Sequence, residues 1–294
     1  MNLDKDIGKD LYRHPQELGR THCVLKILAN VKEYMDFVNE INSDPDFSDP
    51  MLATREQMQC NLLDASNKPT HQIWGIFNGE EISGLFVFLV LEEESYLEML
   101  VGLSRSLEAY EEILSYLKGK YKGCQVDFVF NPNNYLLHKL LQDENAEIYP
   151  EQQKMVLKRE VPHKSGHQIV LYSPEYREQY SSIHQNEGYW TADKVIEASD
   201  AFRVILAIAD DEVVGYIDVT YNHDENEPYD IFVKEEYRRR GYGKAMLARA
   251  IELNRPKGMM LLADVDDTAT LALFESLGFE KSVGENNITA HVLL

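Results

Sequence analysis

Residues 235–247, EEYRRRGYGKAML, form a basic stretch with two glycines in a 294-residue chain whose formal net charge is −21. The pattern of residues 243–253 predicts an amphipathic helix, so three consecutive arginines come just before a helix start. Unpaired N–H groups make that end partly positive, which disfavours each nearby cation by about 0.3–1 kcal/mol. An anion would remove this cost, and Gly241 and Gly243 let the backbone approach one closely. The stretch therefore predicts a phosphate-binding loop, for which a pyrophosphate is a suitable ligand.

Alternative roles for this basic stretch have less support. In the simplest, the arginines belong to a solvated turn and pair with Glu235 and Glu236. A nucleotide-binding P-loop is excluded because GxxxxGK[ST] is not matched, and a Rossmann turn would need a third glycine. Both halves of the chain are acidic, which opposes nucleic-acid binding and weakly favours cationic small molecules or peptides as ligands.

Composition limits the class of protein. An apolar share of 44% and a charged share of 27% are those of a soluble globular protein. The sequence has no apolar run of the roughly 18–20 residues that cross a bilayer, and no signal-peptide core, so we expect a cytoplasmic protein without a membrane partner. Cys23, Cys60 and Cys124 suit reduced thiols, and the absence of HxH or HExxH spacing predicts no metal.

The order of predicted elements occurs twice along the chain. Each copy reads as strand, two helices, three strands, helix, strand, helix and strand, with a polar linker at residues 159–166. The strands are expected at residues 21–28, 71–77, 82–90, 95–103, 124–130 and 154–160, then at 167–172, 202–210, 212–221, 229–233, 258–265 and 288–294. We therefore expect an α/β fold with mixed sheets, in which residues 1–160 and 161–294 are two tandem domains.

A known family shares the decisive motifs. R-x-x-G-x-G, present as Arg238, Gly241 and Gly243 between a strand and an amphipathic helix, resembles the acyl-CoA pyrophosphate loop of the GNAT superfamily of N-acetyltransferases. Residues 264–280, DVDDTATLALFESLGFE, resemble a second block of that family, in the same order and at the same spacing. The resemblance covers about residues 167–294. The first copy lacks the basic glycine loop, so it resembles a degenerate copy that binds no cofactor.

The resemblance implies a set of cofactor-binding residues. Main-chain groups of one strand would pair with the pantetheine arm, and the loop would hold the pyrophosphate through its amides. The residues concerned are Ile231, Phe232 and Val233 on the strand, and Arg238, Arg239, Arg240, Gly241, Tyr242, Gly243 and Lys244 in the loop.

Two positions depart from the family pattern. Asp267 stands where the family often has an asparagine that touches pantetheine, and Phe274 stands where it often has a tyrosine that protonates the CoA thiolate. General-acid help is usually worth about 10²- to 10⁴-fold, so a slower reaction without it is still possible. Tyr242 or Tyr229 would be the hydroxyl that replaces the missing phenol.

An attacking amine must first lose a proton, which requires a base. Asp230 is the leading candidate because it lies three residues before Val233 on the strand that resembles the central strand of the family. Glu227, His223 and His184 are the alternatives.

These observations predict an N-acetyltransferase that moves an acetyl group from acetyl-CoA to a primary amine of a small molecule or peptide. The first copy would complete the acceptor cleft or only pack against the second. The alternatives are a catalytically inactive acyl-CoA sensor and a protein-interaction module. The sequence does not indicate which amine is the acceptor, the acyl chain length or the oligomeric state.

Overall fold

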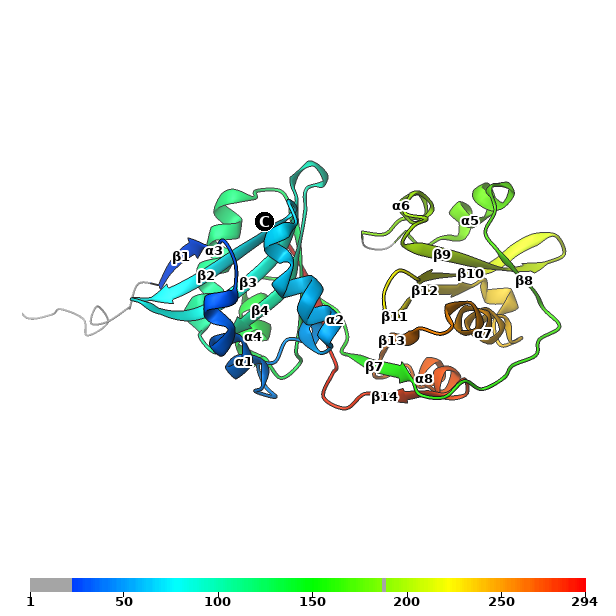
Figure 1. Cartoon of the computed structure of the whole chain (residues 1–294). Coiled ribbons are helices and arrows are strands. Elements are labelled where there is room, and N and C mark those ends of the chain that lie inside the picture. The colour runs from blue at the N-terminus through cyan, green and yellow to red at the C-terminus, as the bar shows by residue number, and fades with distance from the viewer. Residues whose placement is uncertain (1–22, 187–188) are drawn as a thin grey trace, which may run out of the picture.

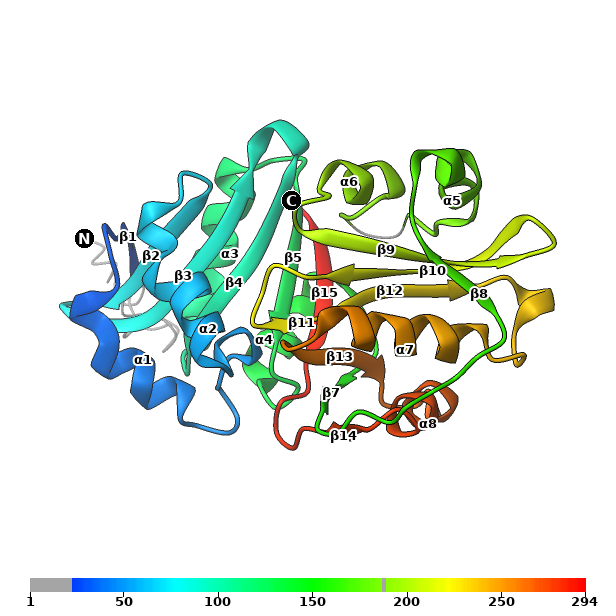
Figure 2. The same ribbon diagram turned by 45° about the vertical axis from the view of Figure 1, so that its right-hand side comes forward.

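The computed structural model describes residues 23–186 and 189–294. Two lobes lie side by side, each built on twisted strands with helices on both faces (Figures 1 and 2). Over the described residues, no helix has the length and apolarity that a membrane crossing requires. The mixed α/β fold class is confirmed.

The first lobe contains a seven-stranded sheet. Its order is β1 (Cys23–Ile27), β2 (His71–Asn78), β3 (Glu81–Leu91), β4 (Tyr96–Ser104), β5 (Gln125–Phe130), β15 (Ile288–Leu293) and β6 (Glu147–Ile148). Helices α3 (Leu107–Lys120) and α4 (Tyr135–Asp143) pack on one face, whereas α1 (Met35–Asn42) and α2 (Arg55–Gln57) belong to the other. The second of the two helices expected between β1 and β2 is broken into the 3₁₀ turn Pro50–Leu52, α2 and a π-helical turn at Met58–Leu63.

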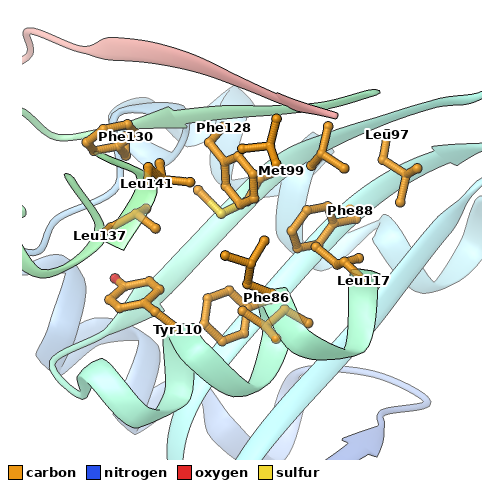
Figure 3. Packing of buried hydrophobic residues seen from close by; sticks show 14 of the residues in the cluster. Phe86, Phe88, Leu97, Met99, Tyr110, Leu117, Phe128, Phe130, Leu137 and Leu141 are labelled. Carbon is orange, nitrogen blue, oxygen red and sulfur yellow. The ribbon is translucent and has the colours of Figure 1, made fainter. Parts of the chain in front are cut away.

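Aromatic packing forms the core beneath α3. Trp74 and Phe86 are fully buried. Tyr110 packs edge-on against Phe86 (Figure 3), with ring centroids 5.7 Å apart. The α3 helix begins at Ser106, whose hydroxyl accepts the Ala109 N–H as an N-cap. This helix start is therefore satisfied by its own side chain.

The second lobe contains two four-stranded sheets. One has the order β12 (Pro228–Val233), β10 (Glu212–Thr220), β9 (Phe202–Ala209) and β8 (Gln168–Leu171); the other has β11 (Glu225–Asn226), β13 (Gly258–Asp264), β7 (Gln152–Leu157) and β14 (Phe279–Lys281). One core contains α7 (Tyr242–Asn254) and α8 (Thr268–Glu275), and the other contains α5 (Arg177–Ile183) and α6 (Ala192–Glu197). The expected β9–β10 hairpin turns at Asp210 and Asp211, which both have positive φ angles of 49° and 64°.

The two lobes exchange strands. The strand predicted as the last one of the first copy, β7, pairs antiparallel with β13 and β14 of the second lobe. The strand predicted as the last one of the second copy, β15, pairs with β5 and β6 of the first lobe, and is the red strand there in Figure 2. Met155 and Ala290 are fully buried, each in the core of the lobe that receives its strand. The prediction that β7 belongs to the first copy and β15 to the second is therefore wrong. Apolar alternation identifies a strand, but it does not identify the strand with which it pairs.

Candidate functional site

The strands of the second lobe separate next to β12. On one edge β12 pairs antiparallel with β10, from Gly215 opposite Val233 to Asp218 opposite Asp230. On the other edge of β12 lies β13, which belongs to a different sheet and pairs there with β11 and β7. In the described parts of the chain, no strand pairs with this second edge over residues 231–233. The N–H and C=O groups there that point away from β10 are therefore available to an extended ligand, except the Val233 carbonyl, which accepts a hydrogen bond from Arg238.

A bulge lies just before this open edge. Asp218 is opposite Asp230, but the next residue, Val219, is opposite Pro228, so Tyr229 is an extra residue in β12. The side chain of Tyr229 is exposed, at 46% of its maximal area. Its ring packs edge-on against Phe202 at 6.0 Å. Such bulges often occur next to active sites, where they redirect side chains.

The N-terminus of α7 meets the open edge. Gly241 is the N-cap with φ of 92°, and it has no side chain to accept the first-turn amides. An added Cβ at Gly243 would lie 3.9 Å from side-chain carbons of both Ile231 and Val233. The predicted loop and the predicted strand are thus brought together, with unpaired helix amides beside free strand groups. This arrangement fits a ligand with an anionic group and an extended polar arm.

The arginines of the loop have different roles. Arg238 donates from Nε to the Val233 carbonyl at 3.0 Å, so it closes the end of β12. Arg239 and Arg240 are exposed, and Arg239 has a left-handed φ of 62°. Glu235 and Glu236 form no ion pair with these arginines in the part of the chain that is described, which does not support a self-neutralised turn.

His167 fixes the loop, although no sequence motif indicates it. Its Nε2 lies 2.8 Å from the Arg240 carbonyl oxygen, which accepts a hydrogen bond from it. Its ring also lies 3.9 Å from the ring of Tyr242, which is half-buried and has Tyr237 on another side at 5.8 Å. Because His167 precedes Arg240 by 73 residues, no local pattern could have indicated this contact.

Asp267 and Phe274 have intramolecular partners. Asp267 caps α8: its carboxylate accepts the Thr270 hydroxyl at 2.6 Å and the Thr270 amide at 3.0 Å, and both bonds lower the pKa of Asp267. Phe274 is 4% exposed and packs against Phe279. The α8 side chain nearest to Gly243 is instead Leu273, at 4.0 Å from the added Cβ position.

Asp230 belongs to a buried polar network. Tyr216 donates its hydroxyl to Asp230 Oδ2 at 2.5 Å, and Tyr180 donates to both carboxylate oxygens of Asp218 at 3.0 Å. His184 Nε2 lies 3.1 Å from Asp218 Oδ2 and 4.0 Å from Asp230 Oδ2. Burial raises the pKa of Asp218, although its bond with His184 opposes that shift. Only the Asp230 side chain is accessible, at 31% exposed, whereas those of His184 and Asp218 are at 2% and 1%.

This network includes a possible metal-ligand group. Among the described residues, one set of three brings its ligand atoms within 4.8 Å of one another: His184, Asp218 and Asp230. His184 Nδ1 accepts the Asn186 amide N–H at 2.9 Å, which assigns the imidazole proton to Nε2, facing Asp218. A metal would need that nitrogen unprotonated. Hydrogen bonding accounts for the cluster, and we continue to expect no metal.

The other candidate bases lie in different surroundings. Glu227 is half-buried beside the bulge, and its carboxylate has no hydrogen bond or ion pair within the described residues. Burial raises the pKa of Glu227 to about 7; Lys154 opposes this shift and Glu225 adds to it. His223 is half-exposed and lies 3.5 Å from Glu56 of the first lobe.

Comparisons with known proteins agree with this geometry. Residues 200–281 match the family model described as acetyltransferase (GNAT) domain. A tandem GNAT protein from the clavulanic acid biosynthesis pathway is 13% identical, with a TM-score of 0.55 over 92% of this chain and 98% of that one. A GCN5-related N-acetyltransferase from Sphaerobacter thermophilus is 10% identical, with a TM-score of 0.62 over 92% and 95%. At such identities the solved structures show the fold alone. No curated protein matches the chain.

The fold and the split sheet define an α/β protein made of two GNAT-type units. Residues 200–281 match the model of a GNAT acetyltransferase domain, and the whole chain has the fold of tandem GNAT proteins.

Proposed function

We propose that the protein is an N-acetyltransferase that moves the acetyl group of acetyl-CoA to a primary amine of a small molecule or peptide. The observation that carries this proposal is the open edge of β12 directly beside the uncapped start of α7. In this proposal residues 161–294 contain the acetyl-CoA site, and residues 1–160 form a degenerate copy without one.

The two parts of the site suit the two parts of coenzyme A. Main-chain groups of Ile231, Phe232 and Val233 on the edge away from β10 would pair with the amides of the pantetheine arm, as an added strand does. The amides of Gly241, Tyr242, Gly243 and Lys244 would bind the pyrophosphate, helped by the exposed Arg239 and Arg240 guanidinium groups. Arg238 would contribute indirectly, through its bond to Val233. Asp267 and Phe274 would line the site from α8, with little free surface in the case of Phe274.

The chemistry needs one base and one leaving group. The acceptor ammonium gives a proton to Asp230 or, alternatively, to Glu227, the two carboxylates that flank the bulge. The neutral amine then attacks the thioester carbonyl carbon, so that the C–N bond forms and the C–S bond breaks. The second ammonium proton leaves during this step, and the thiolate departs and takes up a proton. A thiol pKa near 8.5 makes this a tolerable leaving group without a strong acid. Tyr242, at the helix start, is the hydroxyl proposed to assist.

The first lobe contacts the part of the second lobe that contains α6 and the connection before it. Tyr189, in the connection between α5 and α6, stacks on Tyr96 of β4 at 4.8 Å and donates its hydroxyl to Glu94 at 3.1 Å. Lys194 of α6 forms an ion pair with the same Glu94 at 2.7 Å. These contacts support a first lobe that shapes the acceptor side of the site rather than one that only recruits partners.

The test is turnover with an amine panel. The full chain is incubated with acetyl-CoA and one of several classes of amine, and free thiol and acetylated product are followed by thiol detection and mass spectrometry. The proposal expects CoA release that depends on an amine. Tight CoA binding without release by any amine would instead indicate the inactive sensor.

A further inference from the structure

The first lobe repeats the bulge of the candidate site. In the β3–β4 pair, Val87 is opposite Val101 and Phe88 is opposite Met99, so Leu100 is an extra residue in β4. In the β10–β12 pair the extra residue is Tyr229. Superimposing the two bulges makes Gly102 the counterpart of Ile231, because each lies two residues after the extra one. Residues 102–104 of β4 therefore correspond to the open edge of β12.

The neighbouring strands of the first lobe also separate at the same point. β4 and β5 pair in parallel only from Tyr96 opposite Gln125 to Met99 opposite Phe128. Beyond Met99 they are not paired, just as the pairing of β11 with β13 ends at Asn226 opposite Met259. The first lobe thus has the opening that could accept a pantetheine arm.

Residues 45–52, which we call the plug segment, occupy this opening. Asp49 is 5% exposed, and its Oδ2 accepts the Gly102 N–H at 2.7 Å while its Oδ1 accepts the Met51 N–H at 2.8 Å. From the other side Asn131, just after β5, donates its Nδ2 to the Pro45 carbonyl at 2.9 Å and to the Ser48 hydroxyl at 3.0 Å. The segment is therefore hydrogen-bonded to both separated strand ends.

We infer that the plug segment takes the place of a pantetheine arm in the first lobe, so that this lobe is closed to acyl-CoA by its own chain. The carboxylate of Asp49 accepts the amide that corresponds to Ile231, a group proposed above to bind cofactor. The start of α3 agrees with this inference. Its N-cap, Ser106, uses its hydroxyl to accept a first-turn amide, whereas Gly241, the N-cap of α7, has no side chain that could do so. The comparison of positions rests on the proposed function, but the closure of the first lobe is a property of the free protein.

Hydrogen exchange of the free full-length chain tests the closure without any ligand. The Gly102 amide should be protected in the wild type, and Asp49→Ala should speed its exchange by at least about tenfold, because the amide loses its acceptor. Asp46→Ala is the matched control, since Asp46 lies in the same segment but is exposed. Fast exchange of Gly102 in the wild type, or unchanged exchange in a folded Asp49→Ala protein, would overturn the inference. If Asp49→Ala does not fold, the exchange rate of Gly102 is measured in the wild type and in Asn131→Ala, which frees the plug segment from the end of β5. Faster exchange in Asn131→Ala would support the inference, and fast exchange in the wild type would overturn it.

Calorimetric titration with coenzyme A gives the second readout. One molecule bound per chain is expected, and a second molecule bound in the first lobe would overturn the inference. No binding at all would contradict the proposed function, and the exchange rate of Gly102 would then decide the closure by itself.

Discussion

The Tyr216 hydroxyl lies 2.5 Å from Asp230 Oδ2 and donates a hydrogen bond to that carboxylate. Tyr216 is fully buried, and its ring stacks on His184 at 5.0 Å, so its hydroxyl is held in one direction. The carboxylate proposed as the base is therefore aimed by a group that cannot itself reach the acceptor amine.

Tyr216→Phe removes this hydrogen bond and the weaker one that the hydroxyl accepts from the Gln185 N–H at 3.2 Å, and it retains the ring. We expect kcat to fall by about tenfold or more while KM for acetyl-CoA changes little, because Asp230 loses its orienting hydrogen bond and the cofactor loop is not touched. The free energy of unfolding should fall by about 0.5–1.5 kcal/mol. Tyr221→Phe is the matched control: Tyr221 donates its hydroxyl to the Ser199 carbonyl at 2.7 Å on the exposed surface, so stability alone should respond. Equal kcat values for the two variants would contradict the role of Tyr216.

Gly241→Ala places a side chain at a φ of 92°. The left-handed conformation should cost about 1–2 kcal/mol of stability, and the shifted amides should weaken coenzyme A binding by more than about tenfold. Gly284→Ala is a suitable control because Gly284 has a φ of 77° and open space around its Cβ position, in the connection to β15. The control should lose similar stability and no affinity; melting temperatures and calorimetry measure both. An equal loss of affinity in both variants would show that backbone strain alone explains the effect.

The double substitution Arg239→Ala/Arg240→Ala tests the anion that the loop binds. Both side chains are exposed and form no ion pair among the described residues, so their removal should cost little stability. KM for acetyl-CoA should rise by about 10- to 100-fold, and its dependence on salt should weaken. S-acetyl-pantetheine lacks the pyrophosphate, so turnover of this substrate should be equal in variant and wild type. Arg249→Ala, which removes a charge from the exposed face of α7, is the control for net charge.

The pH dependence separates the two candidate bases. A base acts in its deprotonated form, and burial raises the pKa of Glu227 to about 7. If Glu227 takes the proton, kcat/KM rises about tenfold per pH unit below pH 7 and levels off above it. Glu227→Gln would then remove this rise, whereas Asp230→Asn would lower the plateau and keep the rise. An unchanged pH profile in Glu227→Gln, together with loss of activity in Asp230→Asn, would assign the base to Asp230.

Sequence reasoning reached the loop and the strand because their signals are local. Arg238, Gly241 and Gly243 lie within six residues, and the helix that follows them has its own periodicity. The network behind Asp230 could not be found in this way, since His184 and Asp218 are 34 residues apart and meet only when α5 packs on β10. The same limit applies to Asp49, whose acceptor role depends on Gly102, 53 residues later.

Strand exchange makes the two lobes depend on each other for folding. A chain that begins at residue 161 lacks β7, so β13 and β14 lose the strand that lies between them. The same truncation removes Met155 from the core that contains Met259 and Leu261 and leaves a cavity there. Loss of a buried Met side chain alone costs about 2–5 kcal/mol, which is a large part of the stability of a domain. We expect residues 161–294 alone to be unfolded by circular dichroism, and mixing with residues 1–160 to restore a cooperative thermal transition. A stably folded fragment of residues 161–294 with normal coenzyme A affinity would show that β7 is dispensable.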